Sequence, residues 1–222
     1  MSYNAFVTGG GSNFGAELVD RFGENGFNID VISSKDIDKP FVKNTKLDWN
    51  TITYKKLCSS IDSLKSNSTA DTYDYVVLNH NSGCRYSQNT YGRMTEDEIQ
   101  LWNFEFFQSV QTYEIILNQL SDKIDSNTKI ISLLSGVIEN AESQVTNFFS
   151  GYAGNKSYLY FMMKGYSKSL IGTYVMVNPG HMESSEDYKE SSYRFYDLLS
   201  SLTIESNGLY LRMDGGVINL GV

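Results

Sequence analysis

The sequence has few of the side chains that bind metals or form disulfide frameworks. Its 222 residues include two cysteines, Cys58 and Cys84, and two histidines, His80 and His181. Neither cysteine lies in a paired metal or redox motif, so we expect two unpaired thiols in a reducing compartment and no catalytic metal. The histidines lie in predicted loops, with no G-x-S-x-G turn elsewhere, and are expected at a loop or a cofactor edge rather than as catalytic bases.

Clusters of basic residues and long apolar runs are also missing. The net charge is -8, and Lys and Arg form no stripe of the kind that binds a phosphate backbone, so nucleic acid is not an expected partner. No run of about 18 apolar residues occurs, and the amino terminus has no basic flank before an apolar stretch. These absences predict a soluble, cytoplasmic protein without a membrane partner. With 41% hydrophobic residues, the chain is expected to fold as one domain.

Strand-like and helix-like patterns alternate along the chain. Short apolar runs predict strands within 4–10, 27–33, 44–50, 73–83, 128–136, 172–180 and 208–216. Apolar residues at helical spacing predict helices at 15–26, 51–65, 95–125 and 150–166, the third opening with Thr95 and Glu98 at capping-box spacing. This alternation predicts an α/β domain with a parallel sheet covered on both faces, which binds ligands at the carboxyl ends of its strands.

A glycine-rich turn follows the first predicted strand. In "TGGGSNFG", residues 8–15, glycines allow a tight turn and a close approach to a pyrophosphate at the amino terminus of the next helix. The strict G-x-G-x-x-G pattern does not fit, because Phe14 falls where its third glycine belongs. Taken alone, the turn indicates either a dinucleotide site or only a tight strand-to-helix connection.

Further motifs follow in a fixed order along nearly the whole chain. They are Asp48 in "LDWN", "HNSG" at 80–83, Ser135 at the end of a strand, the Y-x-x-x-K pair Tyr152 and Lys156, "NPGHMES" at 178–184 and the closing "DGG" at 214–216. With a T-G-x-x-x-G-x-G turn, this order resembles the short-chain dehydrogenases/reductases of the compact, single-domain type. Asn13 replaces the middle glycine of that turn, and asparagine tolerates left-handed backbone angles better than most residues.

The resemblance implies a Rossmann-type, doubly wound parallel sheet over residues 1–222, and a nicotinamide dinucleotide cofactor. It assigns catalysis to Ser135, Tyr152 and Lys156. It assigns cofactor binding to Tyr152 and Lys156 together with Thr8, Gly9, Gly11, Ser12, Asn13, Phe14, Gly15, Ser33, Ser34, Lys35, Asp48, Asn81, Ser82, Gly83, Pro179, Gly180 and Ser184. Within this set, Asp48 lies beside the adenine, and Ser184 holds the place of a nicotinamide-contacting threonine.

The three catalytic candidates have complementary chemistry. A tyrosine phenol, with an ordinary pKa near 10, exchanges protons poorly near neutrality, and a nearby cation favours the phenolate. Lys156 lies one helical turn from Tyr152 and is expected to supply that cation and, by the resemblance, to bind the ribose hydroxyls of the cofactor. Ser135 is expected to stabilise the substrate oxygen. Tyr152 is then the general acid in reduction and the general base in oxidation of a carbonyl or secondary alcohol.

A fourth catalytic residue of the family, an asparagine in the helix before Ser135, has no clear counterpart. Phe106 or Gln108 takes its position, depending on the register, and Asn103 lies too early in the sequence. Without this asparagine, a proton relay to solvent would run through another side chain or water.

The second strand favours NADP over NAD. "VISSKD" ends with Ser33, Ser34 and Lys35, where NAD-binding members carry a carboxylate for the ribose hydroxyls. Lys35 is positioned to pair with a 2'-phosphate, or else is only solvated. Two observations point the other way: Ser12 occupies the place of a second basic residue in the glycine turn, and Asp36 lies close enough to turn inward.

Residues 181–206 are fewer than the family usually has between the P-G segment and the closing strand, which predicts a short substrate lid. A short lid suits either a bulky or carrier-bound substrate or a relaxed specificity. The apolar helices at 102–120 and 158–170 resemble the family's dimerising pair, which predicts a homodimer or homotetramer, although these helices can also face only their own sheet.

Two other functions stay open. The missing asparagine and the short lid are compatible with a catalytically idle protein that binds the cofactor to sense it or to stabilise a partner. Epimerisation or dehydration of a nucleotide sugar is a further alternative, which is disfavoured because such relatives carry an additional substrate domain.

Overall fold

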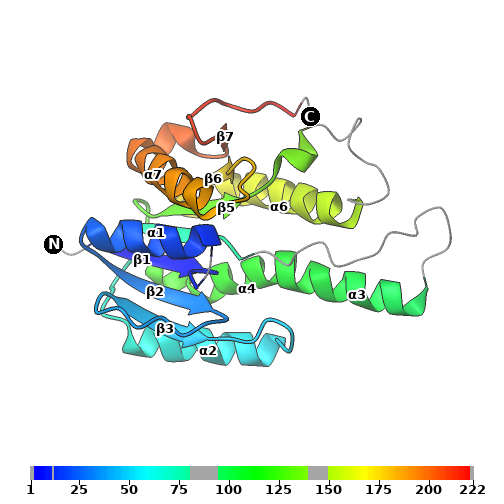
Figure 1. Cartoon of the computed structure of the whole chain (residues 1–222), viewed down its shortest axis with the longest axis horizontal. Coiled ribbons are helices and arrows are strands. Elements are labelled where there is room, and N and C mark those ends of the chain that lie inside the picture. The colour runs from blue at the N-terminus through cyan, green and yellow to red at the C-terminus, as the bar shows by residue number, and fades with distance from the viewer. Residues whose placement is uncertain (1–2, 12, 81–94, 140–149, 221–222) are drawn as a thin grey trace.

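The protein is built on a seven-stranded parallel sheet with strand order β3-β2-β1-β4-β5-β6-β7 (Figure 1). The structure, a computed structural model, describes residues 3–11, 13–80, 95–139 and 150–220. The strands are β1 Tyr3–Thr8, β2 Phe27–Ser33, β3 Val42–Lys46, β4 Tyr75–Leu78, β5 Lys129–Leu133, β6 Thr173–Asn178 and β7 Tyr210–Arg212. The predicted fold class, a Rossmann-type doubly wound sheet in a single α/β domain, is confirmed.

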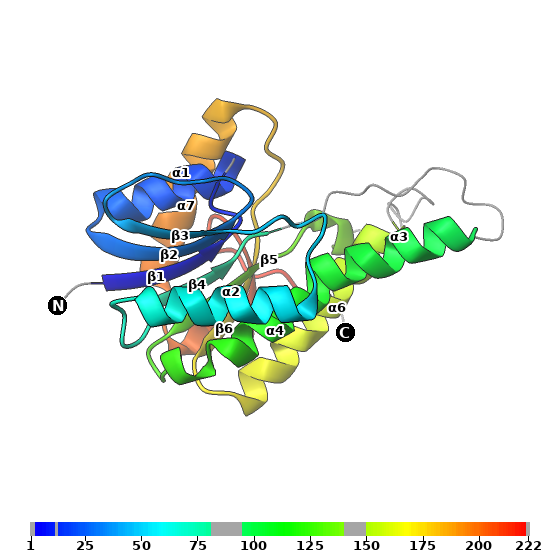
Figure 2. The ribbon, with the colours of Figure 1, turned by 90° about the horizontal axis from the view of Figure 1, so that it is seen from below.

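Helices cover both faces of the sheet, as Figures 1 and 2 show. Helices α1 (Asn13–Glu24) and α7 (Ser185–Ser201) pack side by side on one face. Helices α2 (Tyr54–Asn67), α4 (Thr112–Gln119) and α6 (Ser150–Ser169) cover the other. Among the described residues, none of the helices combines the length and apolar character that a membrane crossing requires.

Alternate residues of the central strands enter two separate hydrophobic cores. In β1, Ala5 and Val7 pack with α1 and α7, whereas Phe6 faces the α2, α4 and α6 side. This alternation follows from the two-residue period of a strand, and burial on both faces explains why the central strands are largely apolar, whereas the edge strand β3 is mostly polar. The sheet is therefore a rigid support whose polar residues gather where its strands end.

The helical region predicted at 95–125 exists but is divided. Helix α3 (Glu96–Phe106) begins with a complete capping box between Thr95 and Glu98, as the sequence indicates. It passes through a π-helical turn at Phe107–Gln111 into α4, and a short 3-10 turn follows at Ser121–Lys123. Figure 2 shows α3 continuing the line of α4 beyond the carboxyl ends of the strands.

Two predicted segments differ in detail. The third strand is predicted at 44–50, but β3 ends at Lys46, because Asp48 folds the chain back by accepting hydrogen bonds from Asn50 N (3.0 Å) and Thr51 Oγ1 (3.0 Å). The segment predicted to contain a short lid, 181–206, consists largely of α7, whose Phe195 and Leu199 are buried in the core beside α1. Only a few residues between β6 and α7 remain outside regular structure.

Candidate functional site

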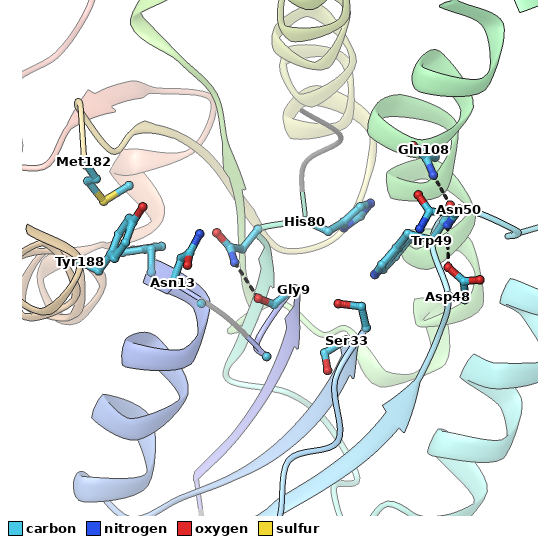
Figure 3. A pocket seen from close by; sticks show the side chains of 15 residues that line it. Gly9, Asn13, Ser33, Asp48, Trp49, Asn50, His80, Gln108, Met182 and Tyr188 are labelled. Carbon is cyan, nitrogen blue, oxygen red and sulfur yellow. Dashed lines mark hydrogen bonds between the residues drawn. The ribbon is translucent and has the colours of Figure 1, made fainter. Parts of the chain in front are cut away.

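A cavity of about 460 Å³ lies at the carboxyl ends of β1, β2, β3 and β4, on both sides of the glycine turn (Figure 3). Strand β1 has β2 on one side and β4 on the other, so chain order reverses here and a crevice opens. This volume is typical of small-molecule sites. The described residues that line it are Gly9, Gly11, Asn13, Phe14, Gly15, Ser33, Ser34, Asp48, Trp49, Asn50, Asn79, His80, Gln108, Met182 and Tyr188.

The glycine turn leaves no room for side chains. A Cβ at Gly15 would lie 2.1 Å from Gly9 O, and a Cβ at Gly11 would lie 2.7 Å from Ser33 Oγ. Asn13, which stands at the family's middle glycine, opens α1 with a positive φ of 52°, a left-handed conformation that asparagine tolerates better than most residues. The turn brings bare backbone and the amino terminus of α1 to the cavity, an arrangement that suits a phosphate group.

A buried hydrogen-bond chain joins the ends of β1 and β4 to α4. Thr8 Oγ1 accepts from Asn79 N (2.9 Å) and His80 N (3.1 Å), which leaves its proton for His80 Nδ1 at 2.7 Å. His80 Nε2 then donates to Thr112 Oγ1 at 2.6 Å, and Thr112 Oγ1 donates to Gln108 O at 2.6 Å. Every proton of the chain has an acceptor if the imidazole is neutral.

The surroundings of His80 keep it neutral. It is 6% exposed, and burial, followed by the nearby charge of Lys156, lowers the pKa of the imidazole to about 3. The ring of Trp49 stacks on it with 4.5 Å between centroids and 11° between planes. His80 was predicted at a loop or cofactor edge, and the structure gives it a more specific place as the buried link between the strand ends.

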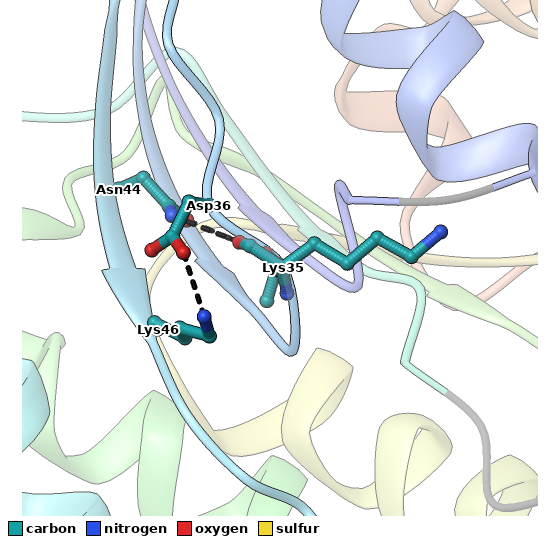
Figure 4. Close-up of polar contacts among 5 residues, drawn as sticks. Lys35, Asp36, Asn44 and Lys46 are labelled. Carbon is teal, nitrogen blue, oxygen red and sulfur yellow. Dashed lines mark hydrogen bonds and ion pairs between the residues drawn. The ribbon is translucent and has the colours of Figure 1, made fainter.

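The end of β2 presents a lysine beside the glycine turn. Asp36, which in sequence lies close enough to turn inward, is instead paired with Lys46 at 2.6 Å on the surface. Figure 4 shows the Lys35 side chain extending away from that pair. A Cβ at Gly11 would lie 3.1 Å from Lys35 Cβ, so the two segments are neighbours. Among the described residues, no hydrogen bond or ion pair holds Lys35 Nζ, and Ser33 and Ser34 line the cavity next to it.

The catalytic candidates lie around the end of β5. Lys156 is 3% exposed, its Nζ donates to Leu133 O at 2.9 Å, and it lies 5.6 Å from the centroid of the Tyr152 ring. Burial lowers the pKa of Lys156 to about 8. Ser135, two residues after β5, caps a 3-10 turn at Gly136–Ile138, where its Oγ accepts from Val137 N at 3.4 Å.

Two buried tyrosines surround this group. The pKa of Tyr113 is raised by burial and then by Tyr152, and Tyr113 Oη donates to Leu78 O and His80 O, both at 2.8 Å. The pKa of Tyr210 is also raised by burial first and, to a lesser extent, by Tyr152. Tyr152 therefore lies within electrostatic reach of both phenols.

The described wall of the cavity includes none of Ser135, Tyr152 and Lys156, which lie beyond its β4 end.

Of the three candidates for the fourth catalytic position, Gln108 reaches the cavity. It is 2% exposed in the π-helical turn, and its Nε2 donates to Trp49 O. Phe106 packs against the ring of Tyr158 at 5.3 Å, and Asn103 lies exposed on α3. Gln108, one of the two residues that the register leaves for the family's asparagine, is thus a buried glutamine that helps to fix the turn after β3.

The residues that line the cavity after β6 differ from those that the sequence pattern predicts. Pro179 and Gly180 follow the strand directly, and Gly180 N donates to Asn178 Oδ1 at 3.0 Å. Ser184 caps α7 and exchanges hydrogen bonds with Asp187, so its side chain is already engaged. Met182 and Tyr188 line the cavity instead, on the same side of Figure 3 as Asn13 and across from Trp49.

Four of the predicted site residues, Ser12, Asn81, Ser82 and Gly83, lie outside the described residues. Asn79, which was not predicted as a site residue, lines the cavity, and its Nδ2 donates to Gly9 O at 3.3 Å. Its place directly after an apolar strand was the available signal. Within the described ranges, no group of three or more His, Cys, Asp or Glu side chains forms a candidate metal site.

Comparison with known proteins identifies the fold. No protein-family model matches the sequence, and a search of curated protein sequences finds no match. The carbonyl reductase Sniffer of D. melanogaster superposes with a TM-score of 0.81 at 12% identity, over 98% of this chain and 99% of its own. A short-chain dehydrogenase/reductase from Serratia marcescens gives 0.74 at 19% identity, over 96% of each chain.

A protein of Burkholderia multivorans, described as a short-chain dehydrogenase/reductase and solved with bound NADP, gives a TM-score of 0.76 at 14% identity. The match covers 99% of this chain and 100% of that one. Such identities establish architecture and leave the chemistry to be argued from the site. Over nearly its whole length, this chain has the fold of the short-chain dehydrogenases/reductases.

Proposed function

We propose that the protein is an NAD(P)-dependent oxidoreductase that interconverts a carbonyl and a secondary alcohol. The observation that carries this proposal is the buried ammonium of Lys156 next to Tyr152. A buried charge is costly, and among the described residues no carboxylate pairs with Lys156. An enzyme that uses Tyr152 as an acid and base gives this cation a function, because it stabilises the phenolate formed when Tyr152 donates its proton.

A dinucleotide fits the residues that are present. The glycine turn, where a Cβ at Gly9 would lie 3.1 Å from His80 Cα, leaves backbone N–H groups and the α1 amino terminus for a pyrophosphate. Asp48 and Trp49 line one end of the cavity and would hold the adenine, and Lys156 would hold the nicotinamide ribose hydroxyls. When bound, a nicotinamide cofactor supplies or accepts a hydride.

The protein's own groups then handle the proton and the substrate oxygen. In reduction, Tyr152 Oη donates a proton to the oxygen of the carbonyl, and the ammonium of Lys156 stabilises the phenolate that remains. Ser135 Oγ donates a hydrogen bond to the same oxygen and stabilises its developing charge. In oxidation, the Tyr152 phenolate accepts the proton of the alcohol. Since Gln108 takes the place of the asparagine, proton exchange with solvent would run through another side chain or water.

We favour NADP over NAD because of Lys35. Its ammonium is exposed, and the carboxylate of the next residue, Asp36, is paired with Lys46. A 2'-phosphate would find a free cation and the exposed hydroxyl of Ser34 there, whereas the buried hydroxyl of Ser33 already donates to Lys35 O. Lys35→Ala is therefore expected to weaken NADPH binding about tenfold, with NADH affinity unchanged and with Lys168→Ala, an exposed lysine in the last turn of α6, as the matched control. Equal effects on the two cofactors would contradict this preference.

A cofactor-binding protein without catalysis is the second candidate. It is favoured by Gln108, whose amide donates to Trp49 O and whose amide oxygen has no hydrogen-bond partner among the described residues. A side chain fixed in this way is a weaker proton-relay element than a free asparagine.

Cytoplasmic localisation stays a proposal that rests on the cysteine content.

The test is NADPH oxidation, followed by absorbance, over a panel of aldehydes and ketones. Tyr152→Phe is expected to lower kcat by 100-fold or more, about the worth of a general acid. Tyr166→Phe is the matched control, because Tyr166 lies on the same helix and donates to Glu114 Oε1 at 3.2 Å, outside the cavity. Tight NADPH binding without turnover on any carbonyl would support the cofactor-binding protein, and turnover that survives Tyr152→Phe would refute the catalytic assignment.

A further inference from the structure

Glu139 lies four residues after Ser135, at the end of the 3-10 turn that Ser135 caps. Its half-buried carboxylate accepts two hydrogen bonds on one oxygen. Tyr210 Oη from β7 donates to Oε1 at 3.0 Å, and Asn178 Nδ2 from the end of β6 donates to the same oxygen. These three residues come from separate parts of the chain and meet directly beside the catalytic candidate Ser135.

The two donors also contact the segments that carry the proposed chemistry. Tyr210 Oη lies 3.1 Å from Ser135 O, and Asn178 Oδ1 accepts from Gly180 N at 3.0 Å. The packing between them is close, since a Cβ at Gly136 would lie 3.2 Å from Asn178 Nδ2. One carboxylate oxygen therefore joins the Ser135 turn to the Pro179–Gly180 turn through two side chains.

Charge makes this junction firm. Hydrogen bonds to a carboxylate are shorter and stronger than those to a neutral acceptor. Tyr210 is 1% exposed, and burial, followed by the charge of Glu139, raises the pKa of its phenol, so Tyr210 remains a donor at neutral pH. Without Glu139, Asn178 Nδ2 would lose its acceptor among the described residues, and Tyr210 Oη would keep only the Ser135 carbonyl.

We infer that Glu139 is a positioning residue that fixes the Ser135 turn and the Pro179–Gly180 turn relative to each other. Under the proposed function, on which this inference rests, the first turn holds the substrate oxygen and the second the nicotinamide end of the cofactor. A small misplacement of the reacting groups, about 1 Å, costs on the order of 100-fold in rate. Glu139 thus sets the alignment of substrate and cofactor without touching either.

The test compares Glu139→Ala, Glu139→Gln and Tyr210→Phe by kcat, KM and the isotope effect with NADPH deuterated at the transferred position. Glu139→Ala is expected to lower kcat per folded protein about 10- to 100-fold. The KM for the carbonyl substrate should change less, and the isotope effect should be at least as large as that of the wild type. Glu139→Gln keeps an acceptor oxygen and should recover most of kcat. Glu139→Ala and Tyr210→Phe should combine less than additively, because they break one unit.

The chain offers a matched control in Tyr166 and Glu114, the same pair of side chains outside the site. Glu114→Ala and Tyr166→Phe are expected to leave kcat and the isotope effect at wild-type values. A purely structural role for Glu139 would lower the melting temperature and leave kcat per folded protein unchanged, which would overturn the inference.

A binding measurement separates failure of the inference from failure of the proposed function. Glu139→Ala is expected to weaken NADP⁺ binding by several-fold and to leave the affinity for adenosine 2',5'-bisphosphate, which lacks the nicotinamide half, unchanged. This result would support the positioning role even in a wild-type protein that turns over no carbonyl. Equal affinities of wild type and Glu139→Ala for both ligands would refute it, whatever the activity.

Discussion

At the scale of single residues, the buried ammonium of Lys156 should limit stability. Its pKa is lowered from 10.5 to about 8 by burial, so between these values the unfolded chain binds more protons than the folded one. Stability then rises with pH through this window, by up to about 1.4 kcal/mol per pH unit from this group. Lys156→Met should lack this rise and should also lose turnover.

Urea unfolding at pH 7.5, 8.5 and 9.5 measures the difference between wild type and Lys156→Met. The exposed lysine of the same helix provides the control Lys168→Met, which should keep the wild-type pH dependence. If the free energy of unfolding changed with pH by the same amount in wild type and in Lys156→Met, the ammonium would not be buried in solution.

His80 should make the protein sensitive to acid. Its folded pKa of about 3 lies below the ordinary value of 6.5, so protons bind preferentially to the unfolded chain at lower pH. The contribution of neutral His80 is fully present above pH 6.5 and is lost as pH falls toward 3, at about 1.4 kcal/mol per unit. Denaturant unfolding between pH 7 and 4.5 should show this slope in wild type and in His181→Gln, an exposed control, and a shallower slope in His80→Gln.

Individual candidate residues could be predicted where a short pattern encodes them. Tyr152 and Lys156 were identified from their local spacing, and the structure brings them together on α6. Asn13 has a backbone conformation that asparagine tolerates better than most residues. The junction of Glu139 and Tyr210 joins residues 71 apart in sequence. A single sequence contains no signal for such a contact, because it depends on the order in which β5, β6 and β7 pair.

At the scale of elements, Ser184 has two alternative roles, one as a cofactor contact and one as a helix cap. The family pattern gives it a cofactor contact, whereas in the structure it caps α7 through a capping box with Asp187. We expect Ser184→Ala to lower the free energy of unfolding by about 1 kcal/mol and to leave NADP⁺ affinity within twofold. Urea unfolding and a fluorescence titration measure these two quantities, with Ser185→Ala as the neighbouring control. Lost affinity with unchanged stability would favour the cofactor contact.

The order and type of most elements could be predicted because hydrophobic periodicity is local. Helix α7 was not predicted, although it begins with a capping box between Ser184 and Asp187 that is also local. Two boundaries have non-local causes. Strand β3 stops before Asp48, whose carboxylate turns the chain, and the helix at 95–125 is interrupted where Gln108 reaches across to Trp49. Side chains that bind another segment set these boundaries, and apolar spacing does not report them.

At the scale of the whole molecule, one face of α3 and α6 carries uncovered apolar side chains. Ile99, Trp102, Tyr158 and Phe161 are between 38% and 59% exposed, and Phe106 packs against Tyr158 between the two helices. We propose that this face joins two copies of the chain in a homodimer or homotetramer. Light scattering should give at least twice the monomer mass for wild type, and Phe161→Asp should dissociate it, because a carboxylate would be buried in the contact.

Ile204→Asp is the matched control, since Ile204 is 67% exposed and lies in the turn after α7. It should keep the wild-type mass. A monomeric mass for wild type at micromolar concentration would exclude the assembly.

The stacking of Trp49 on His80 also gives the protein an intrinsic optical probe. The chain has two tryptophans, and Trp102 lies on the exposed face of α3, so Trp102→Phe leaves one indole, at the wall of the cavity. Its emission overlaps the absorption of reduced nicotinamide, so energy transfer would report bound NADPH, whereas NADP⁺ lacks that absorption band and would give no such transfer. The redox state of the bound cofactor can then be followed without a label and without turnover.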